Sequence, residues 1–161
     1  MSPLTYIFLF ASISLTLAAD VLPDQFYGTF DLDHSENFDE YLTAKGYNFF
    51  IRKIVSYASV QKVFARTSDK TKFDYSNLTS KKNVYYKNIV LGTSFKGEGL
   101  DSTMHEITFS LKNGHLLEHH KPLENGEFQE ETFDYVFQGD NLVLSMSYGG
   151  INARRFFKRT A

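Results

Sequence analysis

The sequence predicts an all-β domain, on three observations. The chain has only three prolines among its 161 residues, and proline is poorly tolerated in sheets. Apolar and polar residues alternate with a period of two along much of its length, which is typical of strands with one buried face. After Ser59, turn-forming residues recur at intervals of about 8–12 residues, as they do in barrels and sandwiches.

The composition is that of one domain and excludes several functions. The chain has 17 basic and 19 acidic side chains, so no sequence-wide positive field points to nucleic acid or to an anionic membrane. A hydrophobic fraction of 42%, with 16 Phe and 10 Tyr, supplies a core. There is no cysteine, which excludes a disulfide scaffold, thiol catalysis and cysteine-type zinc sites. We therefore expect a fold stabilised by burial that binds no nucleic acid.

The first 19 residues differ from the rest. Residues 6–17 form an apolar run, YIFLFASISLTL, that is too short to span a bilayer comfortably. Small residues follow at Ala18 and Ala19, and cleavage after either one fits a signal-peptidase site. The run therefore predicts a signal peptide over residues 1–19, a mature domain over residues 20–161 and secretion from the cell. The alternative is an uncleaved anchor, since no Lys or Arg precedes the run.

The first strand is followed closely by the first helix. Residues 26–33 alternate apolar and polar side chains and are predicted to form a strand. Asn37 and Glu40 then have the spacing of a capping box, although Ser35 is an alternative N-cap. Acidic residues in this first turn suit the helix dipole. The helix is expected to end near Gly46.

Residues 48–58 are ambiguous from their pattern alone. Their apolar residues share a stripe of helical period, but several are β-branched, as is common in strands. The stripe consists of Phe50, Ile51, Ile54, Val55 and Ala58. The pattern leaves a second short helix and a strand both open.

Further strands are expected after Ser59, between turn signals. Their ranges are 61–66, 72–78, 83–91, a brief segment near Phe95, 103–111, 116–123, 128–137, 142–148 and 151–159. The pairs Asn113-Gly114 and Asn125-Gly126 are strong signals for tight hairpins. With the first strand, the total is ten. Ten strands closed on themselves enclose more volume than their side chains fill, because about eight strands already reach that limit. We therefore expect an internal cavity.

The run GTFDLDHSENFDEYL, residues 28–42, resembles the N-terminal signature of the fatty-acid-binding protein family, with Phe30 in place of the usual tryptophan. Further matches are Leu91-Gly92, Phe95, Asp101 and Arg155. The resemblance covers almost the whole mature chain. It implies a ten-stranded antiparallel up-and-down β-barrel of the calycin (lipocalin-like) type, with a helix-turn-helix lid between the first two strands. It also decides residues 48–58 in favour of a helix.

A signal peptide is unusual among these intracellular lipid-binding proteins, and it makes the chain similar to the family's secreted nematode branch. The resemblance implies non-catalytic binding and extracellular carriage of a long-chain fatty acid, by a monomer without a cofactor. No nucleophile elbow, phosphate-binding glycine loop or zinc-protease pair indicates an enzyme. Two alternatives stay open: a carrier of a retinoid or other neutral lipid, and an extracellular structural or interaction protein with a vestigial cavity.

Arg155 is the sharpest candidate for ligand binding. In the last strand it shares a face with Ala153 and Phe157, while Arg154 lies on the opposite face with polar neighbours. An unpaired guanidinium on the inward face would be costly, so Arg155 needs an anionic partner, either an internal carboxylate or a ligand. The alternative is a register shifted by one residue, which would place Arg155 at the surface.

The family binds the fatty-acid carboxylate through an Arg-x-Tyr motif in the last strand. The resemblance assigns the arginine to Arg155 and the tyrosine position to Phe157, which lacks the hydroxyl. A second family arginine falls on Tyr135 or Val136, and neither is basic. The resemblance thus implies a ligand site of Arg155, Phe157 and Tyr135, in which headgroup recognition rests on Arg155.

Lys81 and Lys82 are expected at the ligand entrance. In the family, ligands enter between the two helices and nearby hairpin turns, and Lys82-Asn83 matches a pair in one of these turns. The two lysines would make the rim basic, which would allow transient contact with an anionic membrane or guide fatty-acid carboxylates. The alternative is a solvated turn without a function.

Two other signals are local. Asn77-Leu78-Thr79 is a sequon, so Asn77 is a candidate N-glycosylation site in a secreted chain. His115, His119 and His120 look like a metal cluster at first, but neighbours in a strand point to opposite faces. No cysteine or clear carboxylate completes a site, and we expect no metal centre.

Overall fold

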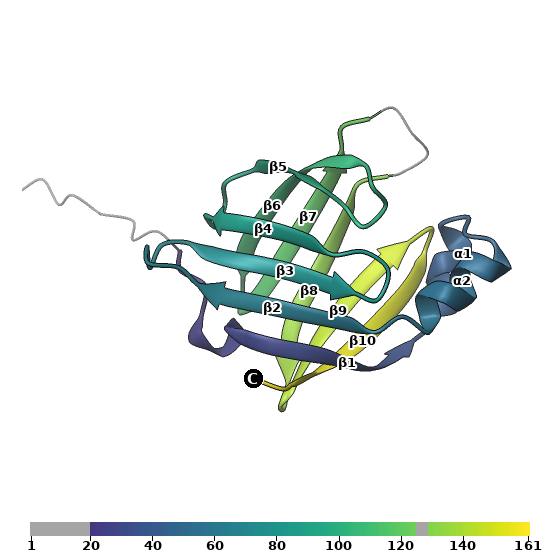
Figure 1. Cartoon of the computed structure of the whole chain (residues 1–161), viewed down its shortest axis with the longest axis horizontal. Helices are drawn as coiled ribbons and strands as arrows, with labels where there is room; N and C mark the ends of the chain where they lie inside the picture. Colours follow the sequence, from purple (N-terminus) through teal and green to yellow (C-terminus); the bar gives the residue numbers. More distant parts are fainter. Residues whose placement is uncertain (1–19, 125–128) are drawn as a thin grey trace, which may run out of the picture.

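Ten strands curve into a barrel with two short helices at one end, as Figure 1 shows for the computed structural model. The structure describes residues 20–124 and 129–161, so the predicted signal peptide, residues 1–19, lies outside the described residues. A 3-10 turn, η1 (Asp24–Phe26), precedes the first strand, and the helices α1 (Phe38–Ala44) and α2 (Phe49–Ser56) follow it. The strands are β1 (Gly28–Glu36), β2 (Val60–Arg66), β3 (Phe73–Thr79), β4 (Val84–Ile89), β5 (Phe95–Glu98), β6 (Met104–Lys112), β7 (His115–Pro122), β8 (Glu131–Gln138), β9 (Asn141–Tyr148) and β10 (Ile151–Arg159).

All ten strands belong to one antiparallel sheet with simple connectivity. Strands that are consecutive in the sequence pair with each other from β1 to β4 and from β5 to β10, and β1 closes the barrel by pairing with β10. The β1–β10 register places Ser35 opposite Arg155. β4 and β5 stand at the two ends of the strand order. The predicted fold, a ten-stranded up-and-down barrel with a helical lid between its first two strands, is confirmed.

The start of α1 differs from the predicted capping box. Asn37 occupies the N-cap position, but its backbone is left-handed, with φ of 53°, and its side chain makes no capping hydrogen bond. Its amide donates instead to the carbonyl oxygen of Asn152, 3.4 Å away. Ser35 is not an N-cap either, because β1 continues past a bulge as far as Glu36 to complete its pairing with β10.

The second helix forms as expected, but it presents its apolar stripe differently. Asn48 caps α2 by accepting a hydrogen bond at Oδ1 from the backbone N–H of Ile51, 3.1 Å away. Ile51 and Val55 line the barrel interior, whereas Phe50 is 77% exposed. α2 packs against α1. Within residues 20–124 and 129–161, neither helix is long and apolar enough to cross a bilayer.

The hairpin between β6 and β7 follows its sequence signal. Asn113 and Gly114 both have positive φ angles, 52° and 83°, as a tight turn of the mirror-image type requires. The second predicted pair, Asn125-Gly126, lies outside the described residues.

The apolar core fills the end of the barrel away from the helices. Phe26 of η1 is fully buried and packs edge-on against Phe64 and Phe137, with ring centroids 6.3 and 5.3 Å apart. Phe30 of β1 joins this cluster. Because aromatic rings occupy this end, the interior volume that stays open lies at the other end, beneath α1 and α2.

Candidate ligand-binding cavity

A cavity of about 470 Å³ lies inside the barrel. Its lining is mostly apolar, and its size falls in the range of about 300–1,000 Å³ that is usual for small-molecule sites. Apolar lining residues come from both helices and from four strands, β2, β4, β8 and β9, among them Phe38, Leu42, Val55, Val60, Val84, Tyr86, Phe133, Leu144 and Met146. The cavity predicted from the strand number is therefore present.

The two helices, one turn and one loop surround one end of the cavity. Residues of α1, α2, the β3–β4 turn and the β5–β6 loop all contribute to its lining there. Lys81 and Lys82 belong to this end, as expected for the rim. Their environments differ, because the Lys82 ammonium is bound to the Glu98 carboxylate (2.8 Å) and the Ser102 hydroxyl (2.6 Å), while Lys81 is exposed. Lys81 is thus the rim cation with its charge directed to solvent.

Arg155 lies on the inner face of β10 and lines the cavity. Its side chain is held by Nε, which donates to the Ser35 hydroxyl (3.2 Å), and by the Phe38 ring, whose centroid lies 4.1 Å from the guanidinium carbon. Its Nη2 atom is buried and has no hydrogen-bond partner among the described residues. Burial lowers the pKa of Arg155 to about 10, so the group is still charged at neutral pH. Arg154 points outward to Glu36, which confirms the predicted register.

Tyr135 and Phe157 are fully buried, but neither belongs to the cavity lining. Phe157 is part of the apolar core. The Tyr135 hydroxyl donates to Glu118 Oε2, 2.6 Å away, and lies 3.0 Å from the Tyr75 hydroxyl. Of the three predicted ligand residues, the structure therefore places only Arg155 at the cavity surface.

Lys62 is a second inward cation, which the sequence analysis missed. It lies on β2, is 4% exposed and lines the cavity. Its ammonium donates to the Tyr75 hydroxyl, 2.7 Å away. Burial lowers the pKa of Lys62 to about 8. The signal was present, because Val60, Lys62 and Phe64 share one face of the strand, and the two apolar members mark that face as buried.

Glu118 is the buried carboxylate of the same interior. It lies on the inward face of β7, where it accepts hydrogen bonds from Tyr135 and contacts His120 Nε2 at 2.8 Å. Burial by itself would raise the pKa of Glu118, but the contacts with His120 and Tyr135 and the positive charge of Lys62 hold it below its ordinary value. The carboxylate is therefore ionised and fully engaged with protein groups.

The histidines occupy different faces, as the alternation predicts. His120 is inside the barrel, and His119 is on the outer face against Thr132. His115 contacts Asp134, also away from the cavity. Within the described ranges, no three His, Asp or Glu side chains come close enough to hold a metal ion.

Asn77, the sequon residue, points into the barrel. Its side chain is 8% exposed and lines the cavity, and its Oδ1 atom is buried without a partner in the described part of the chain. A glycan attached there would have to occupy the ligand volume, so we expect Asn77 to be unmodified in the folded protein.

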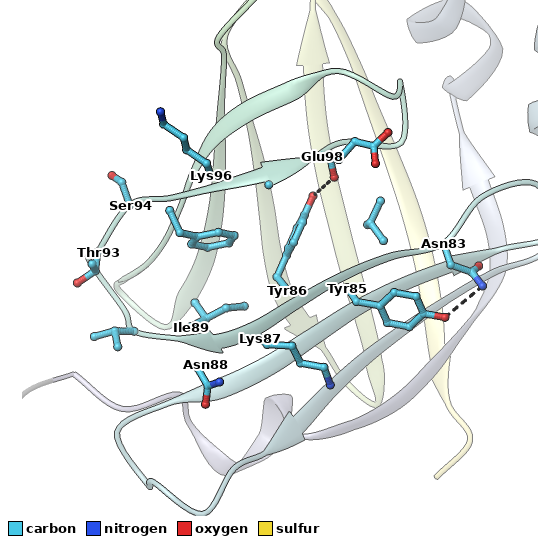
Figure 2. Close-up of a pocket in the computed structure, with 14 residues that line it drawn as sticks. Asn83, Tyr85, Tyr86, Lys87, Asn88, Ile89, Thr93, Ser94, Lys96 and Glu98 are labelled. Atoms are coloured by element: carbon cyan, nitrogen blue, oxygen red, sulfur yellow. Dashed lines mark hydrogen bonds between the residues drawn. The ribbon is translucent and has the colours of Figure 1, made fainter.

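A second hollow, of about 490 Å³, lies between β4 and β5 (Figure 2). Across it the Tyr86 hydroxyl donates to the carbonyl oxygen of Glu98, 3.0 Å away, and joins the two strands at which the sheet order ends. Its charged residues are Lys87, Lys96 and Glu98, and all three are exposed. The interior cavity, with its buried charges, is the better candidate for a specific ligand.

The fold and the cavity define a class: small β-barrel proteins that enclose an apolar ligand beneath a helical lid. No family model matches the chain. Among curated proteins, it is 66% identical over 142 residues to fatty acid-binding protein homolog 1 of Caenorhabditis elegans, covering 88% of this chain and 89% of that one. Homolog 2 of the same organism is 62% identical over 155 residues, with 96% of both chains covered. The chain belongs to the fatty-acid-binding protein family.

Solved structures agree with this assignment. The chain superposes with a TM-score of 0.83 on As-p18, described as an extracellular fatty acid binding protein, at 42% identity and with 88% of this chain and 100% of that chain covered. At this level of identity, the two proteins share the family as well as the barrel.

Proposed function

We propose that this protein is a secreted carrier that binds a long-chain fatty acid in its interior cavity, with the carboxylate at Arg155. The observation that carries the proposal is the buried guanidinium, which lacks a carboxylate partner among the described residues and keeps one donor atom unpaired. A fatty-acid carboxylate supplies both the negative charge and the acceptor that Arg155 lacks.

The surroundings of Arg155 support an acid over a neutral ligand. Lys45 and Glu131, which also line the cavity, are paired with each other, whereas Arg155 has no carboxylate within 4 Å among the described residues. One bound carboxylate would supply the negative charge that Arg155 lacks. A retinoid alcohol or another neutral lipid would leave the charge of Arg155 uncompensated, and burial of an uncompensated charge is costly.

The acyl chain supplies most of the affinity. Burial of about fifteen methylene groups at roughly 0.8 kcal/mol each contributes on the order of 12 kcal/mol before the costs of binding. A hydrogen bond to a charged group adds about 1.5–3 kcal/mol. The mostly apolar lining therefore determines that a lipid binds, and Arg155 determines which headgroup is preferred.

Secretion and delivery complete the proposal. The apolar run at residues 6–17 and the extracellular description of As-p18 both support a secreted protein. For delivery we infer brief contact of the rim with a membrane, because α2 exposes the apolar Phe50 and Ile54 and the β3–β4 turn exposes the basic Lys81. An extracellular structural protein with a vestigial cavity would have no use for a buried cation inside that cavity.

Native mass spectrometry tests the proposal directly. Protein secreted by cells and purified gently should carry bound fatty acid, and the delipidated protein should bind oleate more tightly than oleyl alcohol in a displacement assay with a fluorescent fatty acid. Recovery of an empty barrel that binds neither lipid, or of a neutral lipid bound in preference to oleate, would contradict it.

A further inference from the structure

The cavity contains a continuous chain of hydrogen bonds that ends at an amine. Lys62 Nζ donates to the Tyr75 hydroxyl (2.7 Å), which lies 3.0 Å from the Tyr135 hydroxyl. Tyr135 donates to Glu118 Oε2 (2.6 Å), and Glu118 Oε1 lies 2.8 Å from His120 Nε2. Binding of a carboxylate at Arg155 uses none of these contacts.

Lys62 is held in a state that suits nucleophilic chemistry. No carboxylate lies within 4 Å of its ammonium in residues 20–124 and 129–161, and the ring centroids of Tyr75 and Tyr135 lie 5.4 and 5.7 Å from it. Burial, together with the positive charge of Arg155, lowers the pKa of Lys62 to about 8, against the opposing effect of Glu118. At pH 7.4 about one-fifth of such a lysine is the neutral amine, against roughly 0.1% of an exposed lysine.

We propose that Lys62 captures long-chain lipid aldehydes inside the cavity as a reversible imine. The neutral amine forms a bond from Nζ to the carbonyl carbon, and the carbonyl oxygen takes up one proton as the nitrogen gives one up, which yields a carbinolamine. The carbon–oxygen bond then breaks as the hydroxyl takes up a proton and leaves as water, and the nitrogen loses its second proton as the carbon–nitrogen double bond forms. The overall reaction consumes an amine and an aldehyde and yields an imine and water, with no oxidant or reductant.

The surroundings of Lys62 supply what these steps require. Tyr75 is within hydrogen-bond distance of the reacting nitrogen, and the Tyr135–Glu118 contacts behind it give a path by which protons are exchanged. The apolar lining holds the alkyl chain and limits the water that would hydrolyse the imine. The inference rests on the proposed function only in that the aldehyde uses the same cavity as a fatty acid.

The test uses hexadecanal as the probe and borohydride to make the imine permanent. After reduction, intact mass and peptide mapping should locate one alkyl group per molecule on Lys62. The Lys62→Gln variant should lose at least about tenfold of this adduct, while Lys121→Gln, a change at an exposed lysine of β7, should keep it. Tyr75→Phe should slow adduct formation by about tenfold or more without removing the amine.

The rate should rise with pH as the amine loses its proton, with a midpoint near 8. The ionisable groups that face Lys62 are Tyr75 on β3, Glu118 on β7, Tyr135 on β8 and Arg155 on β10. His120 contacts Glu118 and lies one contact further from Lys62. Near pH 8, Glu118 is ionised and the two phenols and Arg155 are protonated, so we assign a midpoint near 8 to Lys62.

Oleate binding, measured on the same preparations, separates this inference from the proposed function. Retained oleate affinity with alkylation spread over exposed lysines, or with none at all, would overturn the capture of aldehydes and leave the carrier function intact. A wild-type protein that binds neither oleate nor hexadecanal would overturn both. A Lys62→Gln variant that still binds oleate shows that loss of the adduct is not loss of the fold.

Discussion

Two buried cations with different surroundings give the cavity its chemical character. Arg155 contacts the Ser35 hydroxyl and the Phe38 ring, and its Nη2 atom has no hydrogen-bond partner among the described residues. Lys62 is instead part of a phenol–carboxylate network and is close to losing its proton. The same cavity thus has a permanently charged group for an anionic headgroup on β10 and a titratable amine on β2.

Replacement of Arg155 by Gln should separate acids from alcohols. Because we propose that the guanidinium binds the headgroup and not the acyl chain, oleate should lose about 1.5–3 kcal/mol, or ten- to a hundredfold in Kd, and oleyl alcohol should lose little. Displacement of a fluorescent probe measures both. The matched control is Arg154→Gln, whose side chain is exposed and bound to Glu36. Equal losses for both lipids would assign Arg155 a structural role, and an effect at Arg154 would contradict the register.

Removal of the buried amine should change how stability depends on pH. The pKa of Lys62 is about 8 in the folded chain and ordinarily 10.5, so between these values the unfolded chain binds more protons and stability rises with pH. Relative to Lys62→Met, the free energy of unfolding of the wild type should therefore rise by roughly 2 kcal/mol between pH 8 and pH 10. Urea unfolding at several pH values measures the difference. A gap between wild type and Lys62→Met that does not change with pH would contradict this, and Lys121→Met, a change at an exposed lysine, is the matched control.

For single residues, the sequence predicted the direction of a side chain but not its contacts. Alternation in the last strand suffices to turn Arg155 inward and Arg154 outward, because strand geometry is local. The network of Lys62, Tyr75 and Glu118 depends on which strands face each other across the barrel. Alternation gives each residue a side but not a partner, so these contacts could not be predicted.

Among the elements, the helical lid includes predictions that the structure confirms and one that it contradicts. The signature around residues 28–42 predicted α1 and its place, but the capping box failed because Asn37 takes a left-handed backbone conformation and bonds to β10. The stripe of α2 was identified, yet only its Ile51–Val55 side faces the cavity. A helical period gives the angle between side chains, whereas packing against α1 decides how the helix is rotated.

Lys81, in the β3–β4 turn, leads to a prediction about the transfer of fatty acid from the cavity to a membrane. Lys81→Glu should slow transfer of a fluorescent fatty acid to vesicles rich in phosphatidylserine and weaken the dependence of the rate on salt. Lys82 is left unchanged because its ammonium holds Glu98 and Ser102. Lys121→Glu, an equal charge change on β7, is the control. Transfer that is unchanged at low salt would mean that Lys81 is merely solvated.

At the scale of the whole molecule, the proposal that the segment before the barrel is a signal peptide leads to a prediction about the mature chain. Secreted protein should begin at Ala19 or Asp20 and should carry no glycan at Asn77, because that side chain lies within the ligand cavity. N-terminal sequencing and the intact mass of protein from culture medium measure both properties. Met1 retained on membrane-bound protein would contradict the first expectation, and a glycan on folded protein would contradict the second.

The incomplete closure of the barrel has a consequence for how the protein behaves in concentrated solution. A sheet that ends at β4 and β5 has two edges, and an open edge is a template on which strands of other molecules assemble into aggregates. Here β5 has only four residues and bears Lys96 and Glu98 outward, and β4 bears Lys87 before Asn88, whose φ of 54° interrupts a regular ribbon. These features make the molecule a poor seed for intermolecular strand addition, although its sheet has two edges.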